Sequence, residues 1–208
     1  MRLVLASNNA KKVAELRALL GGLAIELVPQ GELGIVEAEE PHATFVENAL
    51  AKARHAAAAA GAAAIADDSG LVVPALDGEP GVASAVYAGA LPASGEREAR
   101  RRRQDAANNA LLLERMRGSG ARQAYFVSTL VALRHAADPE PLVATARWMG
   151  ELLEAERGQG GFGYDPLLHI PALGATVAEL APDVKNRHSH RAQAATQMRA
   201  LLAEVWRL

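Results

Sequence analysis

Apolar positions in the first part of the chain predict strands that alternate with helices. Residues 2–6 form a short apolar run, which is typical of a buried strand. The polar segment that follows opens a helix, because its apolar residues then recur at helical spacing, at Val13, Leu16 and Leu20. A second short strand is expected over residues 25–29. This order is typical of an α/β protein.

Residues at both ends of the next segment predict a second helix. Thr44 and Glu47 have the spacing of a capping box, and Gly61 supplies a stop after the alanine-rich run. Alanine is the best helix former, so this run is expected to be helical up to about residue 60. The apolar residues 62–66 then predict a buried strand.

The second half of the chain predicts a helix near residues 105–117 and a late hairpin. Two long strands are expected over residues 123–135 and 142–152, joined by a Pro-containing turn. A short strand at residues 167–170 and a final helix from about Ser189 complete the order. The chain is therefore predicted to form an α/β fold, a mixed β-sheet flanked by helices.

Composition narrows the class of protein. The 208 residues suit a single domain over residues 1–208, with 50% hydrophobic and 22% charged residues, as in globular proteins. The net charge of −2 argues against a dedicated nucleic-acid binder. Cysteine is absent, so any metal would be held by oxygen or imidazole ligands. No apolar run is long enough for a membrane span or signal peptide, so we expect a cytoplasmic protein with no membrane partner.

Two adjacent carboxylates, Asp67 and Asp68, are expected at the C-terminal end of the strand over residues 62–66, where ligand sites of open α/β sheets gather. Their repulsion raises one pKa unless a cation compensates. Together with Glu37, Glu39 and Glu40 they offer oxygens to a hard cation such as Mg²⁺, which often takes one or two carboxylates plus water and substrate phosphates. The alternative for each group is a solvated acidic loop.

The segment SNNAKK, residues 7–12, lies between a strand and a helix N-terminus. Backbone N–H groups and the helix dipole favour an anion there, and Ser7, Asn9 and Lys12 are candidate donors. The segment lacks the glycines and the Gly-Lys-Ser/Thr ending of a P-loop. A polar N-terminal turn is the alternative.

Two later segments are also rich in polar chemistry. In GQGGFGYDP, residues 158–166, the glycines allow close approach of a ligand, and an exposed Phe162 would stack on a base. The alternative is a Gly-rich hairpin whose aromatic residues pack in the core. The segment KNRHSHR, residues 185–191, offers donors to carbonyl or phosphate oxygens, or is a solvated basic helix start; its candidates are Lys185, His190 and Arg191.

Taken together and in this order, SNNAKK, FVENALAKA, ADDSGL, GGFGYDP and SHR resemble the inosine triphosphate pyrophosphatase family (dITP/XTP pyrophosphatases) from Ser7 to Arg191. The resemblance implies an elongated mixed sheet in two lobes with a central cleft, and a homodimer. It also implies a Mg²⁺-dependent enzyme that hydrolyses ITP, dITP and XTP to the monophosphate and pyrophosphate.

The resemblance also implies residue roles. Asp68 would be the proton acceptor and a Mg²⁺ ligand, with Glu39, or its neighbour Glu40, as the second acidic ligand. The implied substrate-binding residues are Ser7, Asn8, Asn9, Ala10, Lys11, Lys12, Ser69, Phe162, Gly163, Tyr164, Asp165, Lys185, His190 and Arg191.

Two other functions are compatible with the same residues. A magnesium-dependent nucleotidyltransferase needs similar groups, and a nucleotide- or RNA-binding module needs no turnover. The arginine run at residues 100–103 would suit an RNA contact. Its acidic neighbours Glu96 and Glu98, with the negative net charge, favour a solvated helix face instead.

Overall fold

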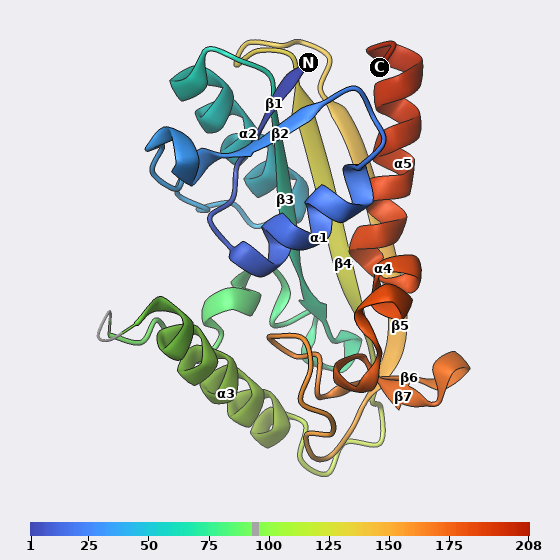
Figure 1. Ribbon diagram of the computed structural model, residues 1–208. Helices are drawn as coiled ribbons and strands as arrows, with labels where there is room; N and C mark the ends of the chain where they lie inside the picture. The colour runs from blue at the N-terminus through green and yellow to red at the C-terminus, as the bar shows by residue number, and fades with distance from the viewer. Residues whose placement is uncertain (93–95) are drawn as a thin grey trace. The chain divides into compact units, whose positions relative to one another are not determined.

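The computed structural model describes residues 1–92 and 96–208 (Figure 1). Its strands are β1 (Arg2–Leu5), β2 (Glu26–Pro29), β3 (Ala64–Val72), β4 (Gln123–Leu133), β5 (Leu142–Leu152), β6 (Leu168–Ile170) and β7 (Ala175–Thr176). Its α-helices are α1 (Ala10–Leu20), α2 (Phe45–Ala60), α3 (Arg97–Arg115), α4 (Pro182–His188) and α5 (His190–Val205). Short 3₁₀ helices cover Gln30–Leu33, Pro74–Leu76, Gly81–Val86, Pro171–Leu173 and Val177–Glu179. Within these described ranges, no helix is long and apolar enough to cross a membrane.

The seven strands follow the order β2-β1-β3-β4-β5-β6-β7. Strand β1 pairs in parallel with β2 and β3, whereas β6 pairs antiparallel with β5 and β7. The predicted α/β fold with a mixed sheet is therefore confirmed.

The described residues form two compact units. The first contains Met1–Ser69, Ser128–Ala146 and Asn186–Leu208, and the second contains Gly70–Val127 and Arg147–Lys185. Strands β3, β4 and β5 contribute residues to both units. The expected single domain over residues 1–208 and the expected cleft stay predictions.

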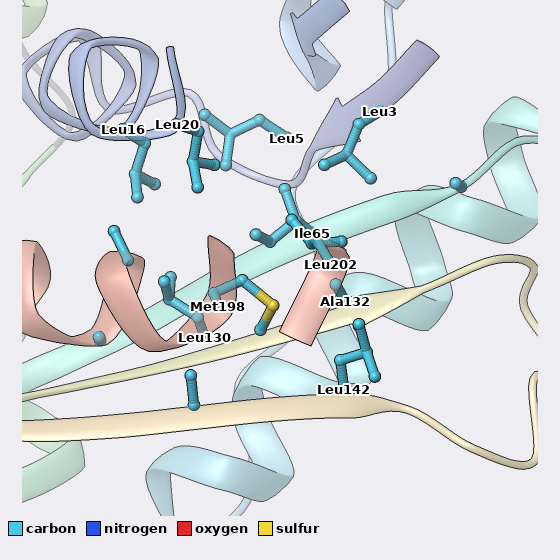
Figure 2. Packing of buried hydrophobic residues seen from close by; sticks show 14 of the residues in the cluster. Leu3, Leu5, Leu16, Leu20, Ile65, Leu130, Ala132, Leu142, Met198 and Leu202 are labelled. Carbon is cyan, nitrogen blue, oxygen red and sulfur yellow. The ribbon is translucent and has the colours of Figure 1, made fainter. Parts of the chain in front are cut away.

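The core of the first unit lies on both faces of its sheet. In β1, Leu3 and Leu5 join a cluster with residues of α1 and α5, whereas Val4 packs with the alanines of α2. This division follows from the strand period of two, which sends successive side chains to opposite faces. Figure 2 shows the first cluster, with Leu16 and Leu20 of α1 opposite Leu130 and Met198. Its labelled members are Leu3, Leu5, Leu16, Leu20, Ile65, Leu130, Ala132, Leu142, Met198 and Leu202.

Helix α2 has the end residues that the sequence predicts. Thr44 is its N-cap and accepts a hydrogen bond from the Glu47 N–H at 3.3 Å. Gly61 ends it in the left-handed conformation at φ 58°. The small alanine side chains let this helix approach the sheet closely, and Ala49, Ala53 and other alanines on that face are buried.

The second unit has its own core, which includes Leu71, Leu112, Phe126, Trp148 and Tyr164. Two features of the chain differ from the sequence prediction. Helix α3 begins at Arg97 and not near residue 105, because the Arg, Glu and Ala residues before residue 105 are good helix formers even without an apolar stripe. Helix α4, in the segment before Ser189, was not predicted.

Strand β3 does not end before the two aspartates, as the sequence suggested, but continues through them to Val72. The prediction was wrong because it took only the apolar run of residues 62–66 as the strand. Ion pairs and hydrogen bonds on both sides of β3 make it possible to bury these charges inside a strand. Asp67 and Asp68 are 2% and 5% exposed.

Candidate active site

The two adjacent aspartates of β3 face opposite sides of the sheet. Asp67 follows the alternation of Ile65 and lies on the side of α1 and α5, whereas Asp68 follows Ala66 and lies on the side of α2. Each carboxylate therefore has its own set of partners, and the sheet separates two charges that are neighbours in sequence.

The carboxylate of Asp67 has partners on both oxygens. Its Oδ1 accepts a hydrogen bond from Ser128 Oγ at 2.7 Å. Its Oδ2 lies 3.1 Å from Arg191 Nη2 and 3.1 Å from Lys12 Nζ, and it also accepts from Ser69 Oγ at 3.2 Å. Burial acts to raise the pKa of Asp67, but Arg191 and Lys12 outweigh it and hold this pKa well below its usual range. Asp67 is therefore a fixed negative charge.

Arg191 is the cation that completes this arrangement from the start of α5. Its guanidinium is 1% exposed and also donates to Ser69 Oγ at 2.9 Å and to Glu15. Ser189 caps α5 by accepting from the Ala192 N–H at 3.1 Å, and this cap fixes the first turn of the helix, which carries Arg191. The structure thus places Arg191 on Asp67; its expected contact with substrate stays a prediction.

Asp68 has a different environment. Its Oδ1 accepts a hydrogen bond from Lys52 Nζ at 2.7 Å. Its Oδ2 is buried and has no hydrogen-bond partner in the part of the chain that the structure describes. Burial raises the pKa of Asp68 to about 6 despite the attraction of Lys52. A carboxylate with an open oxygen and a pKa near neutrality is suited to accept a proton.

Lys52 also links Asp68 to the acidic segment of residues 37–40. Its ammonium lies 3.2 Å from Glu40 Oε1, and burial is outweighed by Asp68 and Glu40, so that the pKa of Lys52 is raised. Glu39, the expected second metal ligand, is exposed beside Glu40. The sequence did not single out Lys52, although it lies in the quoted motif FVENALAKA.

Asn48, one turn before Lys52, ties the end of the acidic segment to α2. Its Oδ1 accepts from the His42 N–H at 3.0 Å, and its Nδ2 donates to the His42 carbonyl at 3.1 Å. Asn48 is 1% exposed. The buried side chain of Asn48 thus holds both backbone polar groups of His42, which lies two positions after Glu40.

The residues around Asp68 fit a hard divalent cation. The buried Oδ2 of Asp68 is a vacant oxygen donor, and the carboxylates of Glu39 and Glu40 are donors of the same chemistry. Within residues 1–92 and 96–208, no group of three or more His, Cys, Asp or Glu side chains is arranged to hold a metal ion. Mg²⁺ does not need one, since it is commonly bound by one or two carboxylates and substrate phosphates.

The predicted anion site at α1 is built mainly from side chains. Asn9 caps the helix, its Oδ1 accepting from the N–H groups of Lys11 and Lys12 at 3.1 and 3.4 Å. Ser7 Oγ accepts from the Asn9 N–H at 3.2 Å. These backbone donors are therefore already engaged. An anion here would be met chiefly by the Asn9 amide, the Ser7 hydroxyl and the lysine ammonium groups.

Asn8 in the same segment lies against Gly31. A Cβ added at Gly31 would lie 2.5 Å from Asn8 Oδ1, so a larger residue there would displace the end of the Asn8 side chain. Lys12, on the Asp67 side, has its pKa lowered by burial even though Asp67 acts to raise it. The sequence identified Asn8 and Lys12 but gave no sign of Gly31 as a neighbour of Asn8.

The second unit gathers the predicted residues of the Gly-rich segment. Lys185 Nζ lies 2.8 Å from Asp165 Oδ2 and 4.6 Å from the centre of the Phe162 ring. The same Asp165 oxygen accepts from the Phe162 N–H at 2.9 Å. Tyr164 is buried and donates its hydroxyl to the Ser84 carbonyl at 3.0 Å. Phe162 is half-buried beneath Lys185, whereas the sequence suggested an exposed ring.

Sequence reasoning missed several residues with a role in this geometry. Ser128 and Glu15 contact the Asp67–Arg191 pair but carry no local signal, because they lie far along the chain from it. His190, which the sequence identified, is buried as the first residue of α5.

Comparison with known proteins gives one consistent result. The Ham1 family model matches residues 3–201. The chain is 66% identical to the dITP/XTP pyrophosphatase of Methylibium petroleiphilum, over 99% of each chain, and 57% identical to that of Burkholderia pseudomallei, over 98% of this chain and 94% of the relative. A solved Ham1 protein from Coxiella burnetii is 41% identical, with a TM-score of 0.87 over 98% of this chain and 99% of the other. The likeness covers both units.

Proposed function

The chain belongs to the Ham1 family, and we propose that it hydrolyses deaminated purine nucleoside triphosphates such as ITP, dITP and XTP to the monophosphate and pyrophosphate. The observation that carries this proposal is the buried carboxylate of Asp68, with one open oxygen and a pKa of about 6. Relatives named dITP/XTP pyrophosphatase, at 53–66% identity, support hydrolysis over transfer to another nucleotide.

Asp68 acts as the general base of this reaction. It takes a proton from a water molecule as the water oxygen bonds to the α-phosphorus of the substrate. The bond between the α-phosphorus and the bridging oxygen breaks, and its electrons leave with pyrophosphate. Lys52 supports this role, since its ammonium fixes Asp68 Oδ1 and leaves Oδ2 for the water.

Asp68, with Glu39 or Glu40, would hold a Mg²⁺ ion, which supplies electrophilic stabilisation of charge on the phosphates. The vacant Oδ2 and the Lys52 bridge to Glu40 support this assignment. Lys52 itself stabilises negative charge on this side of the sheet when the cation is absent.

The segment Ser7–Lys12 binds the triphosphate, and Ser69 contacts the substrate beside Asp68. The side chains of Ser7, Asn9 and Lys12 provide hydrogen bonds and positive charge in place of the engaged backbone donors. Their main contribution is to hold the phosphates in line for attack.

The base is recognised by residues 162–165 with Lys185, and His190 and Arg191 complete the substrate-binding set. An aromatic ring under an ammonium group, as in the Phe162–Lys185 pair, provides an apolar face together with a donor. A donor suits the C6 oxygen of inosine and xanthine and opposes the C6 amino group of adenine. We also propose a homodimer, on the basis of the family resemblance alone.

A nucleotide panel tests the function. Purified protein is given ITP, XTP, dITP, GTP and ATP with Mg²⁺ or with EDTA, and phosphate is measured with and without added inorganic pyrophosphatase. The proposal expects phosphate from ITP, dITP and XTP only when pyrophosphatase is added. Pyrophosphatase itself needs Mg²⁺, so the EDTA samples are read by chromatographic separation of mono- and triphosphates, and no monophosphate is expected there. Binding of these nucleotides with no product would instead indicate a non-catalytic module.

A further inference from the structure

Helix α3 holds both backbone polar groups of Gly163. The Gly163 N–H donates to Asp105 Oδ2 at 2.9 Å, and the Gly163 carbonyl accepts from Asn109 Nδ2 at 3.2 Å. Asp105 and Asn109 are four residues apart and therefore lie on one face of α3. Gly163 has φ 61°, a conformation that other residues rarely adopt. A single helix turn thus fixes a glycine at a conformation that suits a ligand-contacting loop.

Asn109 is unusual among buried residues of the second unit. It is 3% exposed, and its Nδ2 also donates to Glu156 Oε1 at 2.6 Å. Its side-chain oxygen, Oδ1, is buried and has no hydrogen-bond partner among the residues that the structure describes. Such unsatisfied groups are rare in proteins, and they call for an explanation other than packing. Asn109 thus links the backbone carbonyl of Gly163 to the side chain of Glu156.

The held glycine lies inside the segment that binds the base in the proposed function. Phe162, on one side of it, lies under Lys185, and Asp165 holds both Lys185 and the Phe162 N–H. Fixing the N–H and carbonyl of Gly163 sets the planes of the peptides on both sides of it. The Gly163 N–H and carbonyl themselves point to α3, so the peptides that they hold act on the base through the orientation of the neighbouring residues of this segment.

We propose that Asp105 and Asn109 are positioning residues that make the enzyme reject guanine. This proposal rests on the proposed function. Guanine has the same C6 oxygen as hypoxanthine, so donors to that oxygen do not separate the two bases. The difference is the 2-amino group. Xanthine, which the proposed function accepts, has an oxygen of similar size at C2, so the amino group is refused by a backbone donor held in a fixed direction and not by a wall. A Gly163 held at both polar groups provides that rigidity.

The test compares Asp105→Ala and Asn109→Ala with Gln104→Ala. Gln104 is a matched control, because it lies on the same helix but bonds to Gly89, Leu91 and Asn108 and not to Gly163. We expect the ratio of kcat/KM for ITP over GTP to fall about tenfold in both test variants, the equivalent of one hydrogen bond to a charged group. Gln104→Ala keeps the wild-type ratio, and Asp105→Asn, which retains an acceptor oxygen, keeps most of it.

Two further readouts separate positioning from a general loss of structure. Inhibition by pyrophosphate, which has no base, should be unchanged in every variant. Amide hydrogen exchange at Gly163 should be faster in Asp105→Ala than in wild type. An unchanged ITP-to-GTP ratio in a variant whose Gly163 amide exchanges faster overturns the proposal, as does an equal loss of pyrophosphate binding. If Asp105→Ala does not fold, Asn109→Ala decides. Wild-type protein that hydrolyses no nucleotide contradicts the proposed function, and amide exchange then still reports whether α3 holds the glycine.

Discussion

The two sides of β3 treat the same chemical group in opposite ways. On the α1 and α5 side, Asp67 is met by a hydroxyl, a guanidinium and an ammonium group, so that its charge is permanent. On the α2 side, Asp68 is met by one ammonium group, and its second oxygen stays open. Adjacency in sequence therefore does not imply a shared environment, because a strand sends neighbours to different faces.

This contrast assigns the roles of the two carboxylates. Groups whose surroundings move their pKa values apart are the usual acid and base of an active site. Asp67, with a pKa held low, pairs with Arg191 and Lys12, whereas Asp68, with a pKa raised to about 6, is the proton acceptor of the proposed mechanism.

The largest expected effect is on turnover in Asp68→Asn. Loss of the general base lowers kcat about 10²- to 10⁴-fold while the protein stays folded. The measurement is steady-state ITP hydrolysis, with circular dichroism as a check of folding. Arg102→Gln, in the exposed arginine run, serves as a control and should keep wild-type kinetics. Half of the wild-type kcat remaining in Asp68→Asn would remove this residue from the mechanism.

Asp67→Ala is expected to lower the stability of the protein strongly. Its removal leaves Arg191 and Lys12 buried without their carboxylate, which lowers the free energy of unfolding by about 3–5 kcal/mol. Urea denaturation at pH 7 measures it. A loss below about 1 kcal/mol would show that Asp67 does not hold the two cations.

The pH dependence of stability gives the next largest contrast. The ordinary pKa of an aspartate, 3.8, is raised to about 6 in folded Asp68, so the folded state binds this proton more tightly. Its stabilising contribution is complete below about pH 4 and is lost as the pH rises through about 6, by about 1–3 kcal/mol. In EDTA, Asp68→Asn should therefore gain stability relative to wild type between pH 4 and pH 7. A difference that is constant with pH, or that falls, contradicts the raised pKa.

A smaller effect is expected from Asn48→Ala, on the α2 side only. Without the two hydrogen bonds to His42, the acidic segment of residues 37–40 loses its anchor on α2. Mg²⁺ binding in the presence of pyrophosphate, measured by calorimetry, should weaken about tenfold. Asn48→Asp keeps the acceptor for the His42 N–H, so its Mg²⁺ affinity should lie between those of the wild type and Asn48→Ala. An unchanged Mg²⁺ affinity would show that the anchor does not serve the metal site.

Local signals in the sequence were sufficient for most of the fold. The N-cap at Thr44, the stop at Gly61 and the long strand over residues 142–152 were predicted directly, because capping and strand signals depend on nearby residues. The extent of β3 was not, because burying Asp67 and Asp68 depends on cations from three helices. No pattern along the chain announces a pairing such as Arg191 with Asp67, separated by 124 residues.

Local motifs identified candidate site residues but not their surroundings. The resemblance named Asp68 and Lys12, whereas Lys52, Ser128 and Asn109 became visible only as contacts in three dimensions. The sequence of α2 is rich in alanine and that of α3 contains an arginine run, and neither pattern gave a reason to single out Lys52 or Asn109.

The most direct test of the two environments is to titrate both carboxyl carbons by NMR in metal-free protein, with Asp68→Asn to assign the signals. The account predicts one aspartate with a midpoint near pH 6, absent in Asp68→Asn, and a second, Asp67, that stays charged down to the pH at which the protein unfolds. Two aspartates that both titrate near 4, or a raised midpoint that survives in Asp68→Asn, would contradict it.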